Sequence, residues 1–306
     1  MKKIIITGSN GFLGSYITEE FSSNSWEITG IDRKHESQRA EFDQKIEISH
    51  IQSVVPSKIF EDTLLSQQPE IFIHAAGPSS VSESIKNPLK DFEGSVNFLF
   101  YVMDALRRCS PKTRIIFLSS AAVYGNPILI PISETATSHP ISPYGYHKMI
   151  CEKLIEEFFI AYKIRGCSAR VFSAYGPGQK KMVLWDICQK ALKGTTVNLY
   201  GTGNETRDLI HAKDVARCIY LIAENGSFTA ETYNVGNGVE VPVNTLAEEM
   251  LQALNSPNDI VFNQIEREGD PLRWCADISR IQALGYKSTI SLKEGVQGYV
   301  EWVKRL

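Results

Sequence analysis

The 306-residue chain lacks the features that mark several large classes of protein. No apolar run comes close to the roughly eighteen residues that a membrane span needs, so we expect a soluble protein without a membrane partner. Basic residues are not in excess: the formal net charge is −3 and the pI is about 6.1, which disfavours nucleic-acid binding. Internal repeats, low-complexity segments and linkers are also absent from the sequence.

Cysteine and histidine are sparse and scattered. The six cysteines include no C-x-x-C pair, and most of them stand among apolar residues, as buried thiols do. The six histidines show no spacing that is typical of metal ligands. We therefore expect no metal site, and free thiols of this kind predict a reducing, cytoplasmic location.

The most informative stretch that is present stands at the N-terminus. Residues 4–6 are a β-branched run without polar alternation, which is typical of a parallel strand covered on both faces. Gly8 can take the backbone angles of a tight turn, Gly11 lets the main chain approach a pyrophosphate, and Gly14 lets a helix lie against the strand. The free N–H groups and the dipole of that helix favour negative charge, so the stretch predicts a dinucleotide phosphate site.

Asp32 supports this interpretation. It ends the next apolar stretch, eighteen residues after Gly14, where a dinucleotide fingerprint places a carboxylate for the adenosine ribose hydroxyls. The carboxylate favours NAD because it repels the 2′-phosphate of NADP. Arg33 follows and could contact such a phosphate, so NADP stays an alternative. The other interpretation, glycines that only shape a turn, does not account for the strand, the helix and Asp32 together.

The first half of the chain has the rhythm of a doubly wound, Rossmann-type α/β fold with a parallel sheet, because short apolar runs alternate with longer amphipathic stretches. The predicted strands are 4–7, 27–31, 46–48, 71–75, 114–119 and 168–172, and the predicted helices are 11–23, 54–66, 88–109 and 143–164. The last two helices carry large apolar faces that could pack against a second copy of the chain. We therefore expect a homodimer.

The regular alternation of predicted strands and helices becomes less clear after residue 172. We expect an NAD(P)-binding Rossmann domain at residues 1–172 plus about 208–235, and a smaller, interleaved C-terminal lobe that binds the substrate at 173–207 and 236–306. A helix near 212–224 and a strand at 232–235 are expected to return to the sheet. Ligands of open α/β sheets lie beyond the carboxyl ends of the strands, so such a lobe would form the other wall of the site.

Tyr144 and Lys148 are candidates for chemistry. They lie four residues apart at the start of a predicted helix, so their side chains share one face. A free tyrosine is a poor base at neutral pH, but an ammonium beside it favours the phenolate, which could exchange a proton with a substrate oxygen. Ser119 and Ser120 end the preceding strand, where a hydroxyl could hydrogen-bond the same oxygen. Taken alone, a Tyr-x-x-x-Lys pair is more often a solvated helix face, so its context has to decide.

In that context the chain resembles the extended short-chain dehydrogenase/reductases that act on nucleotide sugars. The resemblance extends over nearly the whole chain and rests on several motifs in the right order. They are TGSNGFLG at 7–14, HAAG at 74–77, SSAAVYG at 119–125, Tyr144 with Lys148, Arg170 with YGPG at 175–178, TRDLIH at 206–211 and REGD at 267–270.

The resemblance implies a role for each matching residue. Ser120 matches the catalytic hydroxyl, Tyr144 the acid/base, and Lys148 the residue that holds the nicotinamide ribose and tunes the tyrosine. The expected cofactor contacts are Gly8, Asn10, Gly11, Phe12, Leu13, Gly14, Asp32, Arg33, Ala75, Ala76, Gly77, Tyr144 and Lys148. The expected substrate contacts are Ser79, Ser120, Ser173, Arg207, Arg267 and Asp270.

Three of these residues match positions that grip the diphosphate and ribose of a sugar nucleotide: Arg207, Arg267 and Asp270. A guanidinium suits phosphate better than an ammonium does. The structural alternatives are an ion pair of Arg207 with Asp208 or Glu205, and a surface pair between Arg267 and Asp270.

Two positions depart from the family pattern. Ser173 stands where family members usually carry Asn, which leaves that substrate contact open. The sequence ISHI at 48–51 lacks the Asp that usually follows the third strand and meets the adenine, and no replacement can be assigned.

Ala121 and Ala122 exclude one reaction of the family. Family members that dehydrate a sugar carry Asp-Glu directly after the catalytic hydroxyl, where this chain has the two alanines. Without that acid and base, we reject 4,6-dehydration. The remaining chemistry is hydride transfer at a sugar carbon, most simply C4. The SSAAVYG stretch is most similar to the UDP-galactose 4-epimerase branch, so we expect a UDP-sugar 4-epimerase. The alternatives are a 4-ketoreductase or 4-dehydrogenase with net redox change and, less favoured, a non-catalytic dinucleotide-binding protein.

Overall fold

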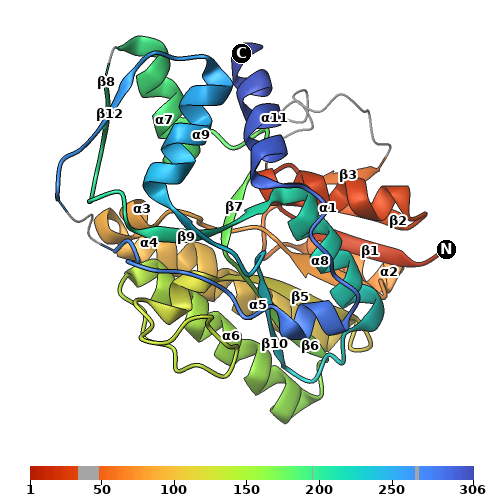
Figure 1. Cartoon of the computed structure of the whole chain (residues 1–306). Coiled ribbons are helices and arrows are strands. Elements are labelled where there is room, and N and C mark those ends of the chain that lie inside the picture. Colours follow the sequence, from red (N-terminus) through yellow and green to blue (C-terminus); the bar gives the residue numbers. More distant parts are fainter. Residues whose placement is uncertain (34–47, 195, 266–268) are drawn as a thin grey trace.

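A seven-stranded parallel sheet forms the centre of the computed structural model, which describes residues 1–33, 48–194, 196–265 and 269–306 (Figure 1). The strand order is β10-β6-β5-β4-β1-β2-β3. The strands are β1 Lys3–Thr7, β2 Glu27–Asp32, β3 Ser49–Gln52, β4 Ile71–His74, β5 Arg114–Ser120, β6 Gly166–Val171 and β10 Thr232–Val235. This is the 3-2-1-4-5-6 order of a doubly wound Rossmann fold with β10 added beside β6, so the predicted fold class is confirmed.

Helices cover both faces of this sheet. Alternate residues of a strand point to opposite faces, so a strand that is apolar throughout needs cover on both of them. Ile4 and Ile6 belong to one buried cluster with α1 Phe12–Ser23 and α8 Ala212–Asn225. Ile5 belongs to the cluster on the other face, with α2 Lys58–Gln67, α5 Phe98–Cys109 and α6 Pro143–Tyr162. The uninterrupted isoleucine run is therefore a strand buried on both faces.

The remaining strands form two small sheets away from the centre. β7 Ser173–Tyr175 pairs in parallel with β9 Thr206–His211, which pairs antiparallel with β11 Glu240–Pro242. β8 Thr196–Leu199 pairs with β12 Asp259–Phe262. A third buried cluster lies among α7 Met182–Lys193, α9 Val243–Leu254 and α11 Leu292–Lys304, which stand together above the central sheet in Figure 1.

Short helical segments complete the architecture. α3 Val81–Lys86 and α4 Pro88–Phe92 precede a π-helical turn, η2 Glu93–Asn97, which continues directly into α5. A 3₁₀ turn, η3 Ala121–Tyr124, follows β5, and α10 Ser279–Ala283 lies near β10. Among the described helices, none is long and apolar enough to cross a membrane.

Most predicted elements have counterparts in the structure, and the third strand is the main exception. Ile48, which we expected inside that strand, lies just before β3, whereas residues 46 and 47 fall outside the described ranges. The predicted helix 88–109 is divided into α4, η2 and α5. The strand expected at 232–235 does join the central sheet, and the helix expected near 212–224 does pack on it.

Candidate active site

The glycine turn after β1 is tightly packed. Gly8 has a φ of 74°, and a Cβ added there would lie 2.8 Å from the Ala76 backbone. A Cβ on Gly14 would lie 2.0 Å from the Gly8 carbonyl oxygen, so the helix approaches the turn as only glycine allows. Gly11 is the N-cap of α1, and no described side chain caps this end of the helix. The N-terminal N–H groups can therefore serve an anion.

Asp32 lies beside this turn, at the end of β2. Its carboxylate accepts hydrogen bonds from the backbone N–H of Asn10 at 3.2 Å and from the backbone N–H of Arg33 at 2.8 Å. The Arg33 residue is exposed. On the other side of the turn, the Ala75 N–H donates to the Thr7 carbonyl at 3.1 Å. The structure thus brings the glycine turn, Asp32 and Ala75 together at the ends of β1, β2 and β4.

His50 is an additional residue at this edge. Its Nε2 lies 2.9 Å from Asn10 Nδ2, and its strand position pairs with Gly30. The sequence lacked an assignable partner for the adenine at 48–51, and His50 is the polar side chain that this stretch brings next to the glycine turn. The residue was missed because a lone histidine in a short polar strand has no distinguishing pattern.

Ser120 ends β5 and is the N-cap of η3. Its Oγ accepts a hydrogen bond from the Ala122 N–H at 3.2 Å, which caps the turn. The start of α6 lies directly against this turn: a Cβ on Gly145 would lie 2.5 Å from the Ala122 carbonyl oxygen. Tyr144 packs against the buried cluster that contains Ala121 and Ala122. The close approach of α6 therefore places Tyr144 beside the turn that Ser120 caps.

Lys148 is one helical turn after Tyr144 and is 7% exposed. Its Nζ donates to the Leu118 carbonyl at 2.8 Å and lies 5.7 Å from the centre of the Tyr144 ring. This contact fixes the ammonium at the end of β5, close to the tyrosine. The three predicted catalytic side chains are thus carried by two elements that meet at the carboxyl edge of the sheet.

His74, at the end of β4, is buried and has no role in the predicted chemistry. Burial lowers the pKa of His74 to about 3, with the charge of Lys148 adding to the effect. Its Nδ1 lies 2.9 Å from Thr7 Oγ1, and its ring packs edge-on against Phe98. At neutral pH the imidazole is therefore an uncharged packing residue.

On the substrate side, Arg207 of β9 is held by backbone carbonyls. Its Nη1 donates to Thr206 at 2.9 Å and to Pro271 at 2.7 Å, and its Nη2 lies 3.8 Å from the Asp270 carboxylate. Burial lowers the pKa of Arg207, which means that the guanidinium is poorly solvated. A poorly solvated cation favours an anionic ligand.

The acidic residues beside Arg207 in the sequence bind elsewhere. Asp208 accepts backbone N–H groups of Asn237, Gly238 and Ala276 at 2.7 to 2.9 Å. Glu205 accepts from the backbone of Thr202 and Gly203. The carboxylate near Arg207 is therefore that of Asp270, and the predicted alternative, an ion pair with Asp208 or Glu205, is wrong.

The other predicted substrate residues are placed less specifically. Ser79 is exposed in the loop after β4, and Ser173 begins β7 beside β9, paired with Leu209. Arg267 lies outside the described residues. In the part of the chain that the structure describes, no group of three or more His, Cys, Asp or Glu side chains could hold a metal ion.

A hollow of about 390 Å³ lies between α1, α8 and α11. Residues of α8 and α11 line it together with Tyr16, Pro177 and His211. Ser120, Tyr144 and Lys148 are not among its lining residues, so this hollow does not serve the predicted chemistry.

Comparison with known proteins decides the family. The model of the NAD dependent epimerase/dehydratase family matches residues 4–236. The chain belongs to this family. The UDP-glucose 4-epimerase of Mycolicibacterium smegmatis is 26% identical over 314 residues, which cover 99% of this chain and 98% of the relative.

Two solved structures extend the comparison. The UDP-N-acetylglucosamine 4-epimerase from Methanobrevibacter ruminantium M1, solved with UDP-N-acetylmuramic acid, is 26% identical with a TM-score of 0.90, covering 100% of this chain and 99% of that chain. MoeE5, solved with UDP-glucose and NAD, is 25% identical with a TM-score of 0.88, covering 99% of each chain.

The residues of this epimerase/dehydratase family member fit NAD on structural grounds. The glycine turn leaves no room for side chains at Gly8 and Gly14, and the N-terminus of α1 begins directly after it. Asp32 lies next to the same turn. A pyrophosphate with its adenosine ribose matches this donor and acceptor set.

Proposed function

We propose that this chain is an NAD-dependent nucleotide-sugar 4-epimerase, with UDP-sugars as the first substrate class. The observation that carries the proposal is the meeting of η3 and α6 at Gly145, which brings Ser120, Tyr144 and Lys148 together at the carboxyl edge of the sheet. The names of the similar epimerases support the choice of reaction.

The cofactor would be held by the glycine turn and the start of α1 at its pyrophosphate, by Asp32 at the adenosine ribose, and by Lys148 at the nicotinamide ribose. When bound, NAD supplies a reversible hydride acceptor. Asp32 would favour NAD over NADP, because its carboxylate would repel a 2′-phosphate on the adenosine ribose.

The chain's own residues move the proton. Tyr144 takes the proton of the sugar hydroxyl as the carbon that carries this hydroxyl is oxidised. Ser120 hydrogen-bonds the same oxygen. The ammonium of Lys148, 5.7 Å from the ring centre, stabilises the negative charge that the tyrosine oxygen carries between proton transfers. Tyr144 returns the proton when the keto sugar is reduced from its opposite face, so no net proton or hydride is consumed.

Epimerisation also requires that the keto sugar turn over while its diphosphate stays bound. Arg207 suits this task because two backbone carbonyls fix its guanidinium and burial weakens its solvation. We assign Arg207, Arg267 and Asp270 to the diphosphate and ribose, and Ser79 and Ser173 to the sugar side. Residues 173–207 and 236–306 would then form the substrate lobe.

We also assign the protein to the cytoplasm. All six cysteines are free thiols, and five of them are buried. Such cysteines suit a reducing compartment.

The experiment is a conversion assay on freshly purified protein with UDP-, GDP- and dTDP-sugars. Products are separated by chromatography while the absorbance of reduced nicotinamide is followed. Conversion without net change in nicotinamide supports the epimerase. Stoichiometric formation or consumption of NAD(P)H would instead make the protein a 4-dehydrogenase or 4-ketoreductase, and bound cofactor without any conversion would favour the non-catalytic alternative.

A further inference from the structure

Tyr124 is the last residue of η3, the turn that Ser120 caps, and its side chain is buried. Its hydroxyl donates to Asn234 Oδ1 at 2.7 Å and accepts a hydrogen bond from Arg170 Nη1 at 2.8 Å. Burial raises the pKa of Tyr124 to about 12, so the hydroxyl keeps its proton at neutral pH. One hydroxyl therefore connects the catalytic turn to two neighbouring strands, β6 and β10.

On the β6 side, the hydroxyl contacts a buried ion pair that spans the catalytic elements. Arg170 binds Glu152 of α6 through two hydrogen bonds of 3.0 and 2.7 Å, and both side chains are 8% exposed. Ser119, at the end of β5, donates to the same carboxylate at 2.6 Å. Glu152 lies one helical turn after Lys148. The ion pair thus ties β5, β6 and α6 together behind the site.

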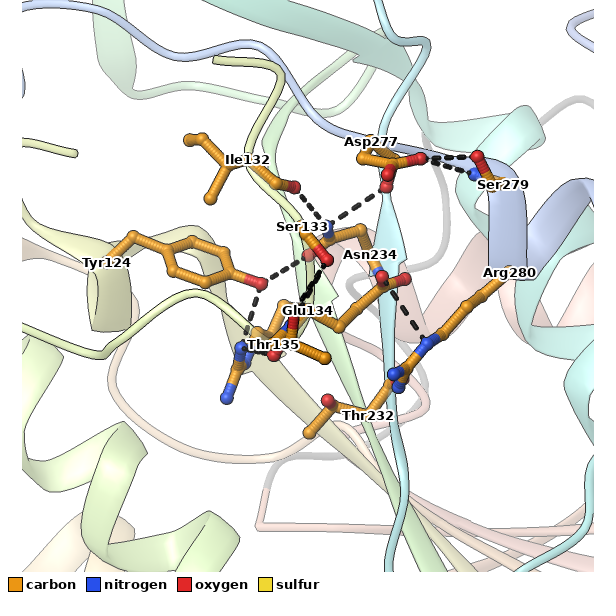
Figure 2. Close-up of polar contacts among 11 residues, drawn as sticks. Tyr124, Ile132, Ser133, Glu134, Thr135, Thr232, Asn234, Asp277, Ser279 and Arg280 are labelled. Atoms are coloured by element: carbon orange, nitrogen blue, oxygen red, sulfur yellow. Dashed lines mark hydrogen bonds and ion pairs between the residues drawn. The ribbon is translucent and has the colours of Figure 1, made fainter. Parts of the chain in front are cut away.

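On the β10 side, Asn234 is fully buried and uses its whole amide group. Its Nδ2 donates to the carbonyls of Ile132 at 2.7 Å and Asp277 at 3.1 Å, while its backbone N–H donates to Glu134 Oε1 at 3.0 Å. Figure 2 shows the Tyr124 hydroxyl pointing toward Asn234, with Ile132 and Asp277 beyond it. Asn234 therefore links the Tyr124 hydroxyl to Asp277, in the C-terminal segment of the chain.

The segment that ends at Asp277 also carries the contacts of Arg207. The Pro271 carbonyl accepts from Arg207, and the Trp274 ring centre lies 6.0 Å from its guanidinium. The Trp274 Nε1 donates to the carbonyl of Gly125, the residue after Tyr124, at 3.0 Å. A continuous set of contacts thus joins the proposed phosphate-binding arginine to the catalytic turn.

We propose that Tyr124 is a positioning residue whose hydroxyl holds η3, and with it Ser120, in place against Tyr144 while the segment 270–277 binds the sugar nucleotide. The inference rests on the proposed function. A shift of about 1 Å in a group that contacts the reacting oxygen lowers the rate by roughly 100-fold, so a turn that carries such a group has to be fixed. Tyr124 fixes it from both sides through Arg170 and Asn234.

The test is Tyr124→Phe, which removes one hydroxyl and keeps the ring. We expect kcat per NAD-loaded site to fall about tenfold or more, while KM for the sugar nucleotide and the bound NAD change less than about twofold. Tyr233→Phe is the matched control, because this neighbour of Asn234 donates its hydroxyl to Glu231 at 2.9 Å instead. Its kcat should equal that of the wild type.

A double-mutant cycle with Ser120→Ala separates positioning from general packing. If Tyr124 acts through Ser120, Tyr124→Phe costs less than about threefold when Ser120 is already Ala. An equal loss in both backgrounds, or wild-type kcat in the single variant, overturns the proposal. If Tyr124→Phe does not fold, Asn234→Ala replaces it in the cycle; this variant removes the hydrogen bond from Tyr124 together with those to Ile132 and Asp277.

The two proposals fail in different ways. A folded, NAD-loaded wild type that converts no sugar nucleotide overturns the proposed function and this inference together. An active wild type whose kcat does not depend on Tyr124 overturns the inference alone.

Discussion

Ser120, Tyr144 and Lys148 each make a hydrogen bond that helps to fix the residue. Ser120 Oγ accepts from the Ala122 N–H, Lys148 Nζ donates to the Leu118 carbonyl, and the Tyr144 N–H donates to Ser84 Oγ at 3.1 Å. Groups that are held in place before the reaction need little reorganisation when charge moves. The site therefore suits proton transfer at one fixed oxygen.

Tyr144→Phe tests the acid/base at this scale. We expect kcat to fall about 100-fold or more, because a positioned acid/base contributes roughly that factor, while NAD stays bound. The measurement is kcat per bound NAD, with NAD content determined on the denatured protein. Tyr146→Phe, two residues along the same helix and exposed, serves as the control. Unchanged turnover in Tyr144→Phe would remove the residue from the mechanism.

The motif residues could be assigned from the sequence because their spacing is local. Gly8 to Gly14 form one turn, and Tyr144 and Lys148 lie one helical turn apart. The supporting contacts could not be assigned, since Arg170 binds Glu152 across 18 positions and Tyr124 binds Asn234 across 110. Tyr124 and Arg170 stand in motifs that the sequence shows, but their partners Asn234 and Glu152 stand in none, and only the folded sheet brings the partners together.

At the scale of elements, the decisive contact is the one between α6 and η3. Gly145→Ala places a methyl group 2.5 Å from the Ala122 carbonyl oxygen, and backbone cannot yield as a flexible side chain does. We expect a loss of about 1–3 kcal/mol in the free energy of unfolding and a fall in kcat of about tenfold or more. Urea unfolding and the conversion assay measure the two effects.

Gly298→Ala is the control for that substitution. Gly298 also lies inside a helix, α11, but a Cβ there meets no described atom within 4 Å. The substitution should raise the free energy of unfolding by up to about 1 kcal/mol and leave kcat unchanged. Equal kcat in the two alanine variants would show that the close approach of α6 is unnecessary.

The elements that the sequence misplaced have physical reasons. β3 is an edge strand with polar Ser49, His50 and Gln52, so an apolar run could not mark it. The helix expected at 88–109 is interrupted by the η2 turn, which contains Gly94. Helical segments continue on both sides of the turn, so the sequence pattern did not separate them. The central strands were predictable because burial on both faces requires unbroken apolar runs.

His211, at the N-terminus of α8, should make the free energy of unfolding of the protein sensitive to acid. His211 caps this helix by accepting the Lys213 N–H at 3.2 Å, and burial lowers its pKa to about 4. The unfolded chain therefore binds the proton first, and stability is lost as pH falls from about 6.5 toward 4, by up to about 1.4 kcal/mol per pH unit for this group. Above about pH 6.5 the group has no effect on stability.

His211→Asn keeps a capping side chain and removes the titrating group. We expect a shallower fall in the urea midpoint between about pH 6.5 and pH 5 than in the wild type. His139→Asn, at an exposed histidine, should keep the wild-type slope. Parallel slopes for His211→Asn and the wild type would contradict the assignment of the acid sensitivity to His211.

At the scale of the whole molecule, α5 and α6 present apolar side chains on the outer side of the sheet. Ile160 is 62% exposed and Phe100 is 45% exposed, and Tyr101 and Tyr162 are exposed on the same two helices. Because α5 and α6 pack together, we propose that this surface joins two copies of the chain.

Sedimentation tests the dimer. The wild type should sediment as a dimer at micromolar concentration, and Ile160→Glu should dissociate it, because the new charge would have to be buried without a partner. Leu192→Glu, at an exposed leucine of α7, should leave the dimer intact. A wild-type monomer would contradict the proposal.

The most direct test of the epimerase follows the hydrogen at C4. The UDP-sugar that the chain converts is prepared with deuterium at C4, and the product is examined by mass spectrometry and NMR while reduced nicotinamide is measured. We expect the C4 epimer to keep its deuterium and the amount of reduced nicotinamide to show no net change. Loss of the label to water, or one reduced nicotinamide per sugar converted, would contradict this expectation.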